Sequence, residues 1–109
     1  MYKTITKHAV SINNDDVAMF SGSEFLNTEK FLKSCFIVNG TNASGKATCY
    51  IKNSNNEVYF LFSPEQALKS GDSFSGIMKS IPINDDDVIY FTGTSGLECS
   101  LIIDYATQA

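Results

Sequence analysis

The sequence has few of the residues on which enzymes most often depend. Its one histidine, His8, lies in a predicted strand between Lys7 and Ala9, and no nucleophile elbow or local cysteine-protease signature is present. Residues 39–46, NGTNASGK, have the glycines and lysine of a phosphate-binding loop but precede a predicted strand, whereas such a loop precedes a helix. We therefore expect no enzymatic activity, no catalytic residue and no cofactor.

Basic runs and long apolar stretches are also missing. The chain has 8 Lys and Arg against 12 Asp and Glu, a formal net charge of -4, and its basic residues are scattered. Such a balance does not favour a surface that binds nucleic acid. No segment approaches the roughly 18 apolar residues of a membrane span, and residues 1–12 lack the apolar core of a secretion signal. We expect a protein made in the cytoplasm, without nucleic-acid or membrane partners.

Cysteine is scarce and odd in number. Cys35, Cys49 and Cys99 are widely spaced, which fits neither a disulfide framework nor the C-x-x-C pairs of a zinc site. Each lies in an apolar run, so we interpret them as buried free thiols rather than as ligands or nucleophiles. The sequence therefore predicts no metal site, and the thiols suit a reducing compartment.

What the sequence does contain is apolar residues with the strand period of two. Apolar residues make up 43% of the 109 residues and charged residues 18%, as in ordered globular proteins. In Leu97–Tyr105 the odd positions are Leu, Cys, Leu, Ile and Tyr, and the even positions are Glu, Ser, Ile and Asp. The pattern predicts eight strands, at residues 4–12, 17–22, 31–38, 46–52, 57–62, 74–83, 87–92 and 97–105.

Eight short strands joined by turn-rich segments predict an all-β fold, an antiparallel sandwich of the jelly-roll kind in one domain over residues 1–109. A short helical turn is expected near residues 63–70, where Ser63 would cap it and Pro64 would take its first position. Residues 23–30 fit either a brief helix or a loop. Residues 1–6 are a candidate extended arm that would add a strand to a neighbour's open edge.

Residues 57–62 contain a continuous apolar run, Tyr59 to Phe62, on both faces of the predicted strand. Such a run is typical of a central core strand and only weakly indicates a platform on which sugars stack. We therefore expect it in the middle of a sheet.

One line of the sequence occurs twice. Residues 12–23, INNDDVAMFSGS, and residues 83–94, INDDDVIYFTGT, are identical at seven of twelve positions. Asn and Asp favour turns, so both lines predict hairpin tips, either one in each sheet or adjacent around a pseudo-twofold axis. The five aspartates of these turns would hold calcium if the tips met, but they lack the Asp-x-Asp-x-Asp-Gly spacing and are interpreted as solvated turn residues. They are Asp15, Asp16, Asp85, Asp86 and Asp87.

Four segments together form a recognisable layout along the chain. They are an Asn-rich loop at residues 39–44, a Gly-Asp-Ser connection within 67–74, an acidic turn and strand at 85–93, and a closing strand at 97–105. This layout resembles the small all-β virion structural proteins of tailed bacteriophages; residues 23–30 depart from it. The resemblance implies a virion component made in the host bacterial cytoplasm: capsid decoration (cement) first, neck or tail next. It also implies a homo-oligomer whose partners are major capsid or neck and tail proteins.

Two other classes of function stay open. A carbohydrate-binding or host-recognition module of a fibre would use Tyr50, Tyr59 or Tyr90 to stack on sugars. A small intracellular inhibitor would block a host enzyme by acidic mimicry.

Overall fold

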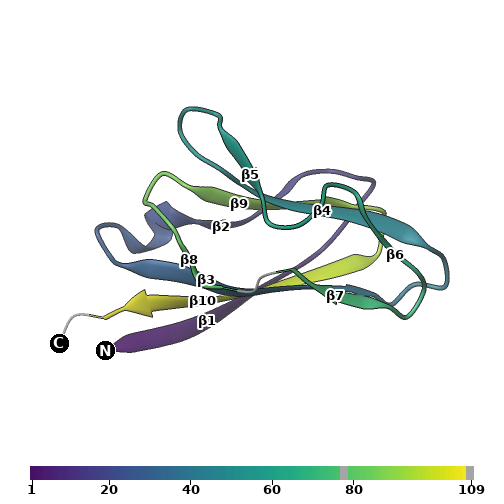
Figure 1. The fold of residues 1–109 in the computed structure, drawn as a ribbon, viewed down its shortest axis with the longest axis horizontal. Coiled ribbons are helices and arrows are strands. Elements are labelled where there is room, and N and C mark those ends of the chain that lie inside the picture. Colours follow the sequence, from purple (N-terminus) through teal and green to yellow (C-terminus); the bar gives the residue numbers. More distant parts are fainter. Residues whose placement is uncertain (77–78, 108–109) are drawn as a thin grey trace.

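Two antiparallel sheets pack face to face in the computed structural model, which describes residues 1–76 and 79–107 (Figure 1). Sheet A has the order β1 (Tyr2–Val10), β10 (Leu97–Ala106), β3 (Lys30–Asn39) and β7 (Ser73–Ser75), with β8 (Ile81–Pro82) also beside β3. Sheet B has the order β2 (Val17–Ser21), β9 (Val88–Gly93), β4 (Gly45–Lys52) and β5 (Val58–Phe60), with β6 (Gln66–Leu68) also beside β4. The predicted all-β sandwich is confirmed.

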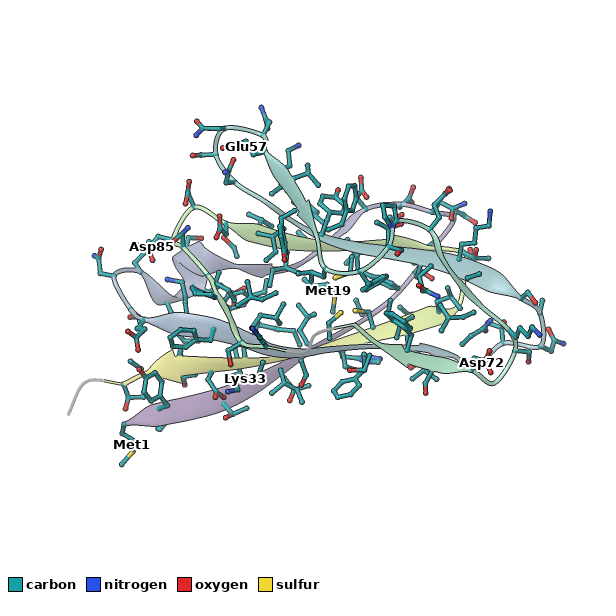
Figure 2. All side chains as sticks on the ribbon, viewed as in Figure 1. Met1, Met19, Lys33, Glu57, Asp72 and Asp85 are labelled. Atoms are coloured by element: carbon teal, nitrogen blue, oxygen red, sulfur yellow. The ribbon has the colours of Figure 1, made fainter. Side chains whose placement is uncertain are left out.

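The core lies between the sheets because the long strands alternate as predicted. In β10 the side chains of Leu97, Cys99, Leu101 and Ile103 are fully buried, and the residues between them are half-buried. Strands β4 and β9 bury every second residue in the same way, and β3 does so on either side of a bulge at Lys33. Side chains fill the space between the two layers (Figure 2). In the described part of the chain, no helix has the length and apolarity needed to cross a membrane.

The first residues of β1 and the last residues of β10 lie side by side at one end of sheet A (Figure 1). Strand β1 pairs with β10 from Tyr2 opposite Ala106 to Val10 opposite Glu98, and the Thr107 N–H donates to the Met1 carbonyl at 2.8 Å. From Tyr2 onward, the candidate arm at residues 1–6 is thus a paired strand of this chain, because its backbone groups form hydrogen bonds with the neighbouring strand β10.

The prediction of a helical turn near residues 63–70 is wrong. Glu65 has a left-handed backbone (φ 55°) and donates its N–H to Thr48 Oγ1 at 2.8 Å, and Gln66–Leu68 then form β6 against β4. Burial of Leu68 in the core and pairing with β4 outweigh the local helix signals.

The short helix is instead a 3₁₀ turn, η1 (Gly22–Phe25), followed by a loop before β3. A capping box forms it: the Ser21 hydroxyl accepts from the Ser23 N–H at 3.3 Å, and Glu24 accepts from the Ser21 N–H at 3.2 Å. Residues 23–30 therefore contain part of a short helix and a loop, the two alternatives that the sequence left open.

The predicted strand at residues 74–83 is divided into β7 and β8, and residues 77–78 of that prediction lie outside the described residues. Strand β6 is a further addition to the predicted set, so the described residues contain ten strands rather than eight. The extra strands have two or three residues each and border the long strands.

The repeated acidic lines are not hairpin tips. The first connects β1 of sheet A to β2 of sheet B, and the second connects β8 of sheet A to β9 of sheet B, so both are corners between the layers. The strands that follow them, β2 and β9, are antiparallel neighbours, with Val17 opposite Phe91 and a bulge between Ala18 and Phe20. The two lines therefore lie adjacent, as in the second predicted arrangement.

Adjacent placement explains why the two lines are alike. The Gly22 N–H at the end of the first line donates to the Asp87 carbonyl in the second corner at 2.8 Å. The Asn14 N–H in the first corner donates to the carbonyl of Gly93, near the end of the second line, at 3.0 Å. Each corner packs against the end of the other line. Both corners therefore require a tight bend next to closely packed backbone, and similar residues meet this requirement.

Candidate functional site

A hairpin formed by β4 and β5 rises from the edge of sheet B (Figure 1). Its turn is built on Asn53, whose side-chain oxygen accepts from the N–H groups of Asn55 at 2.9 Å and Glu57 at 3.0 Å. Asn56 takes the left-handed backbone (φ 62°), which asparagine tolerates better than most residues. The Ser54 hydroxyl donates to Asp86 Oδ2 at 2.7 Å, and this bond ties the tip to the second acidic corner.

Strand β5 exposes every one of its side chains. Val58 is 46%, Tyr59 61% and Phe60 46% exposed, and the buried Leu61 and Phe62 follow only where the strand ends. The predicted central core strand is therefore wrong: among the described residues, β5 has a neighbouring strand, β4, on one side only. Sequence alone cannot separate a strand that is apolar on both faces in a core from one at an adhesive edge.

The free edge of β5 carries unpaired backbone groups. The Leu61 N–H donates to the Cys49 carbonyl at 3.0 Å and the Asn53 N–H to the Glu57 carbonyl at 3.1 Å, which fixes the alternation of the ladder. By that alternation the backbone groups of Val58 and Phe60 point away from β4. An extended segment of another chain can pair with such an edge.

An aromatic row crosses the outer face of sheet B. The rings of Tyr50 and Tyr90 are stacked with their centroids 5.2 Å apart, and Phe60 meets Tyr50 edge-on at 6.2 Å. These side chains point outward because their strand neighbours, such as Cys49 and Phe91, point into the core. Partial burial and the carboxylate of Asp16 raise the pKa of Tyr50.

Tyr59 faces the other side of the hairpin and lines an open groove of about 370 Å³. The lining of the groove is mixed, with apolar and polar residues, and comprises Ile51, Asn53, Glu57, Val58, Tyr59, Ile81, Pro82 and Asp87. We call Tyr50, Val58, Tyr59, Phe60 and Tyr90 together the β5 surface. Its chemistry is that of a contact surface: exposed rings, an open strand edge and a groove between layers.

His8 lies on the outer face of sheet A with two partners from β10. Its Nδ1 is 2.9 Å from Ser100 Oγ and its Nε2 is 3.2 Å from Glu98 Oε1. This set of residues has the composition of a Ser-His-Glu triad, but it lies on a flat, half-exposed face. The backbone of Ser100 lies in a strand paired on both sides, with β1 and β3, so its N–H serves the ladder and does not form an oxyanion hole.

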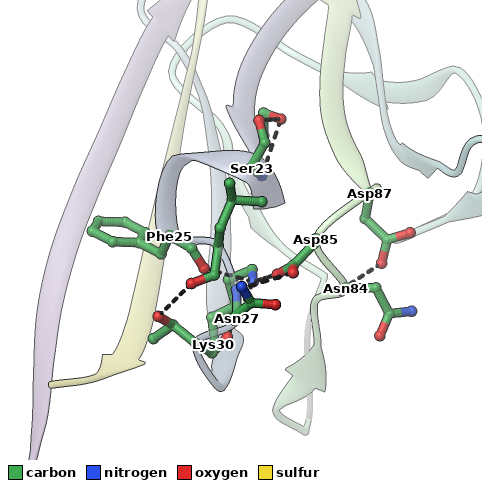
Figure 3. A network of polar contacts seen from close by, with 10 residues as sticks. Ser23, Phe25, Asn27, Lys30, Asn84, Asp85 and Asp87 are labelled. Carbon is green, nitrogen blue, oxygen red and sulfur yellow. Dashed lines mark hydrogen bonds and ion pairs between the residues drawn. The ribbon is translucent and has the colours of Figure 1, made fainter. Parts of the chain in front are cut away.

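The second acidic corner is occupied by structural contacts (Figure 3). The buried ammonium of Lys30 forms an ion pair with Asp85 and donates to the carbonyls of Phe25 at 3.0 Å and Thr28 at 3.1 Å. Asp85 also accepts from the Asn27 N–H at 3.0 Å. The bond from Lys30, with that from Asn27, lowers the pKa of Asp85.

The other two aspartates of this corner have different partners. Ser54 lowers the pKa of Asp86 through bonds from its hydroxyl and N–H, and Asp87 accepts from the Asn84 N–H at 2.9 Å. Within residues 1–76 and 79–107, the three possible metal ligands that lie close together are the cysteines, and the aspartates of the two corners do not form such a group.

Cys35, Cys49 and Cys99 are all buried, as the sequence predicted. Their convergence, with sulfur atoms all within 4.8 Å of one another, was not predicted, because residues far apart in sequence meet only through the pairing of strands. One feature of the sequence is consistent with this convergence: all three cysteines occupy core-facing positions in long strands.

Comparisons with known proteins give a likeness in structure only. No protein-family model matches the sequence, and no curated protein does either. A chain in the structure of the infectious bursal disease virus Gx strain is similar over 100% of this chain, with 7% identity and a TM-score of 0.49. A mutant VP2 protein of infectious bursal disease virus, from derived T=1 particles, is similar over 99%, with 8% identity and a TM-score of 0.39. The protein spans 38% and 36% of those two chains.

Proposed function

We propose that this protein is a non-enzymatic virion structural protein that acts through protein–protein contacts. Within that class we propose a capsid decoration or cement protein of a tailed bacteriophage first, and a neck or tail component second. Its partners would be major capsid or neck and tail proteins, with further copies of itself in a symmetric assembly. The layout of residues 36–109 supports the bacteriophage class, since it resembles small all-β virion proteins.

The observation that carries the proposal is the exposure of all three β5 side chains beside an open strand edge. Apolar and aromatic side chains gathered at one place are typical of protein interfaces, where aromatic residues contribute most of the binding energy. The turn that presents them is held by Asn53 and by the bond from Ser54 to Asp86. A preorganised hairpin loses less conformational entropy on binding than a flexible loop.

The test is to count copies of the chain in purified virions by quantitative mass spectrometry. Hundreds of copies per particle would indicate a shell component, and about a dozen would indicate a neck or tail component, because these parts have different symmetry. Absence of the chain from purified particles would contradict the proposal.

A carbohydrate-binding module of a fibre is the second candidate, and the stacked pair of Tyr50 and Tyr90 favours it. Exposed aromatic rings bind the apolar faces of sugars, and Asp16 beside Tyr50 would supply a hydrogen-bond acceptor. A glycan array probed with the intact protein separates the two functions. Retention of a glycan that is lost on Tyr50→Ala would favour the module, and no retained glycan would remove it.

A further inference from the structure

Three cysteines from both sheets bring their sulfur atoms together in the centre of the core. Cys35 of β3 and Cys99 of β10 come from sheet A, and Cys49 of β4 comes from sheet B. All three residues are 0% exposed, and their Sγ atoms lie within 4.8 Å of one another, with Cys35 and Cys99 at 3.9 Å. Sulfur atoms are visible in the space between the layers in Figure 2.

This spacing is close to what a metal ion requires. Sulfur ligands about 2.3 Å from a common ion lie about 3.8 to 4.0 Å from one another, in tetrahedral or trigonal geometry. The Cys35–Cys99 distance of 3.9 Å already has this value, and the widest separation in the cluster must shorten by less than about 1 Å. Rotation about the side-chain torsions of small residues allows such a change without movement of the strands.

The charge of the ion matters because the cluster is fully buried. A monovalent cation that replaces one thiol proton leaves the charge of the core unchanged, so it avoids the cost of burying a net charge.

We propose that Cys35, Cys49 and Cys99 form a three-sulfur site for the soft monovalent ion Cu(I). Thiolate ligands select soft ions, whereas a structural Zn²⁺ site almost always has four ligands and this cluster supplies three. In the binding step the S–H bond of one cysteine breaks, a Cu–S bond forms at that sulfur, and one proton leaves. The other two cysteines donate sulfur lone pairs, and no atom changes its oxidation state.

The site faces the core, whereas Tyr50 of the β5 surface faces outward from β4, the strand that also carries Cys49, and the site does not depend on the proposed virion function. Buried cysteine also serves as a small apolar core residue, and three such residues would need no ion. The two roles differ in a measurable way, because a packing role gives no affinity for Cu(I).

The experiment is an anaerobic titration of the intact protein with Cu(I), supplied from a competing chelator, followed by X-ray absorption spectroscopy. The expected result is one Cu(I) per chain with three sulfur neighbours. The variants Cys35→Ala, Cys49→Ala and Cys99→Ala should each weaken binding by at least about tenfold, the lower end of what loss of an outer-shell partner costs. Ile103→Val is the matched control, since it removes a similar core volume, leaves all three thiols in place and should bind Cu(I) as before.

Two results would overturn the proposal: no equimolar binding by the native protein, or bound copper with oxygen or nitrogen neighbours. Circular dichroism of each variant shows whether it is folded. If an alanine variant does not fold, the native protein alone decides, because an ion that binds only the folded state must raise its Tm. An unchanged Tm at saturating Cu(I) would count against the site as strongly as absence of binding.

Discussion

The ammonium group of Lys30, whose side chain is 1% exposed, is paired with the carboxylate of Asp85, a residue 55 positions later in the chain. Lys30 begins β3 in sheet A, and Asp85 lies in the corner that leads from sheet A to sheet B. The pair therefore fastens the corner to the first residue of a central strand. The same ammonium also donates to the carbonyls of Phe25, the last residue of η1, and of Thr28 in the loop that follows.

Replacement of Lys30 by alanine should destabilise the fold by about 3 kcal/mol or more, because it leaves a cavity and buried groups without a donor. Lys30→Met should cost less, since it keeps the apolar stem of the side chain. Urea unfolding measures both. Lys33→Ala is the control: Lys33 lies at the bulge of the same strand and is exposed, so the change should stay within about 0.5 kcal/mol. Equal effects of Lys30→Ala and Lys33→Ala would contradict the role of the pair.

The same pair predicts how stability depends on pH. Because the pKa of Asp85 is lower in the folded state than its ordinary value of 3.8, the carboxylate stabilises the fold above that value. This contribution is lost as the pH falls from 3.8 through the folded-state pKa. The difference in unfolding free energy between the native protein and Asp85→Asn should therefore be constant from pH 7 to 5 and shrink below pH 4. A difference that stays the same at low pH would show that the charge of Asp85 is not involved.

Gly22 should tolerate no side chain, since a Cβ atom there would lie 1.9 Å from the backbone oxygen of Asn84. The backbone of the second corner cannot move away without breaking the bond from the Gly22 N–H to Asp87. Gly22→Ala should therefore lower the unfolding free energy by about 3 kcal/mol or more. Gly71→Ala is the comparison: Gly71 has a left-handed backbone (φ 82°) but open space around it, so the cost should be about 1 kcal/mol. The reverse order in thermal unfolding would mean that the corners are packed differently.

Changes on the β5 surface should affect binding and spare the fold. Tyr59 is 61% exposed, so Tyr59→Lys should change the unfolding free energy by less than about 0.5 kcal/mol. If this surface is the interface, the same change should weaken attachment to particles by about tenfold or more, as for an aromatic hot spot. Leu26→Lys is the control, because Leu26 is equally exposed, at 61%, and lies outside the β5 surface. Full attachment of the Tyr59 variant in a particle-binding assay would place the interface elsewhere.

The strands that the sequence predicted well are those whose two faces differ in polarity. In β10 the alternation of Leu97, Cys99 and Leu101 with polar residues gave both the strand and its buried face. Strand β5 was misplaced because Tyr59 and its neighbours are apolar on both faces, and period alone does not say whether a partner covers them. The segment from Ser63 to Gly71 has every local signal of a helix, and an available strand edge on β4 outweighed them.

The candidate sites were less predictable than the strands because they depend on long-range pairing. The sequence singled out Tyr50, Tyr59 and Tyr90, but the stack of Tyr50 on Tyr90 follows from the register of β4 and β9. The repeated acidic lines were recognised and their adjacent placement was among the alternatives. Their role as corners between the sheets was not predicted, because the same Asn and Asp residues favour a tight turn in a hairpin and in a connection between two sheets.

The hydrogen bond between Met1 and Thr107 holds the outer ends of β1 and β10 at one place on the molecule. A short linker would join them without crossing the sandwich, so a circularly permuted protein opened at an exposed turn should keep every strand in its present position. A label or a second domain attached beside Met1 or beside Thr107 would then lie at nearly the same place on the sandwich.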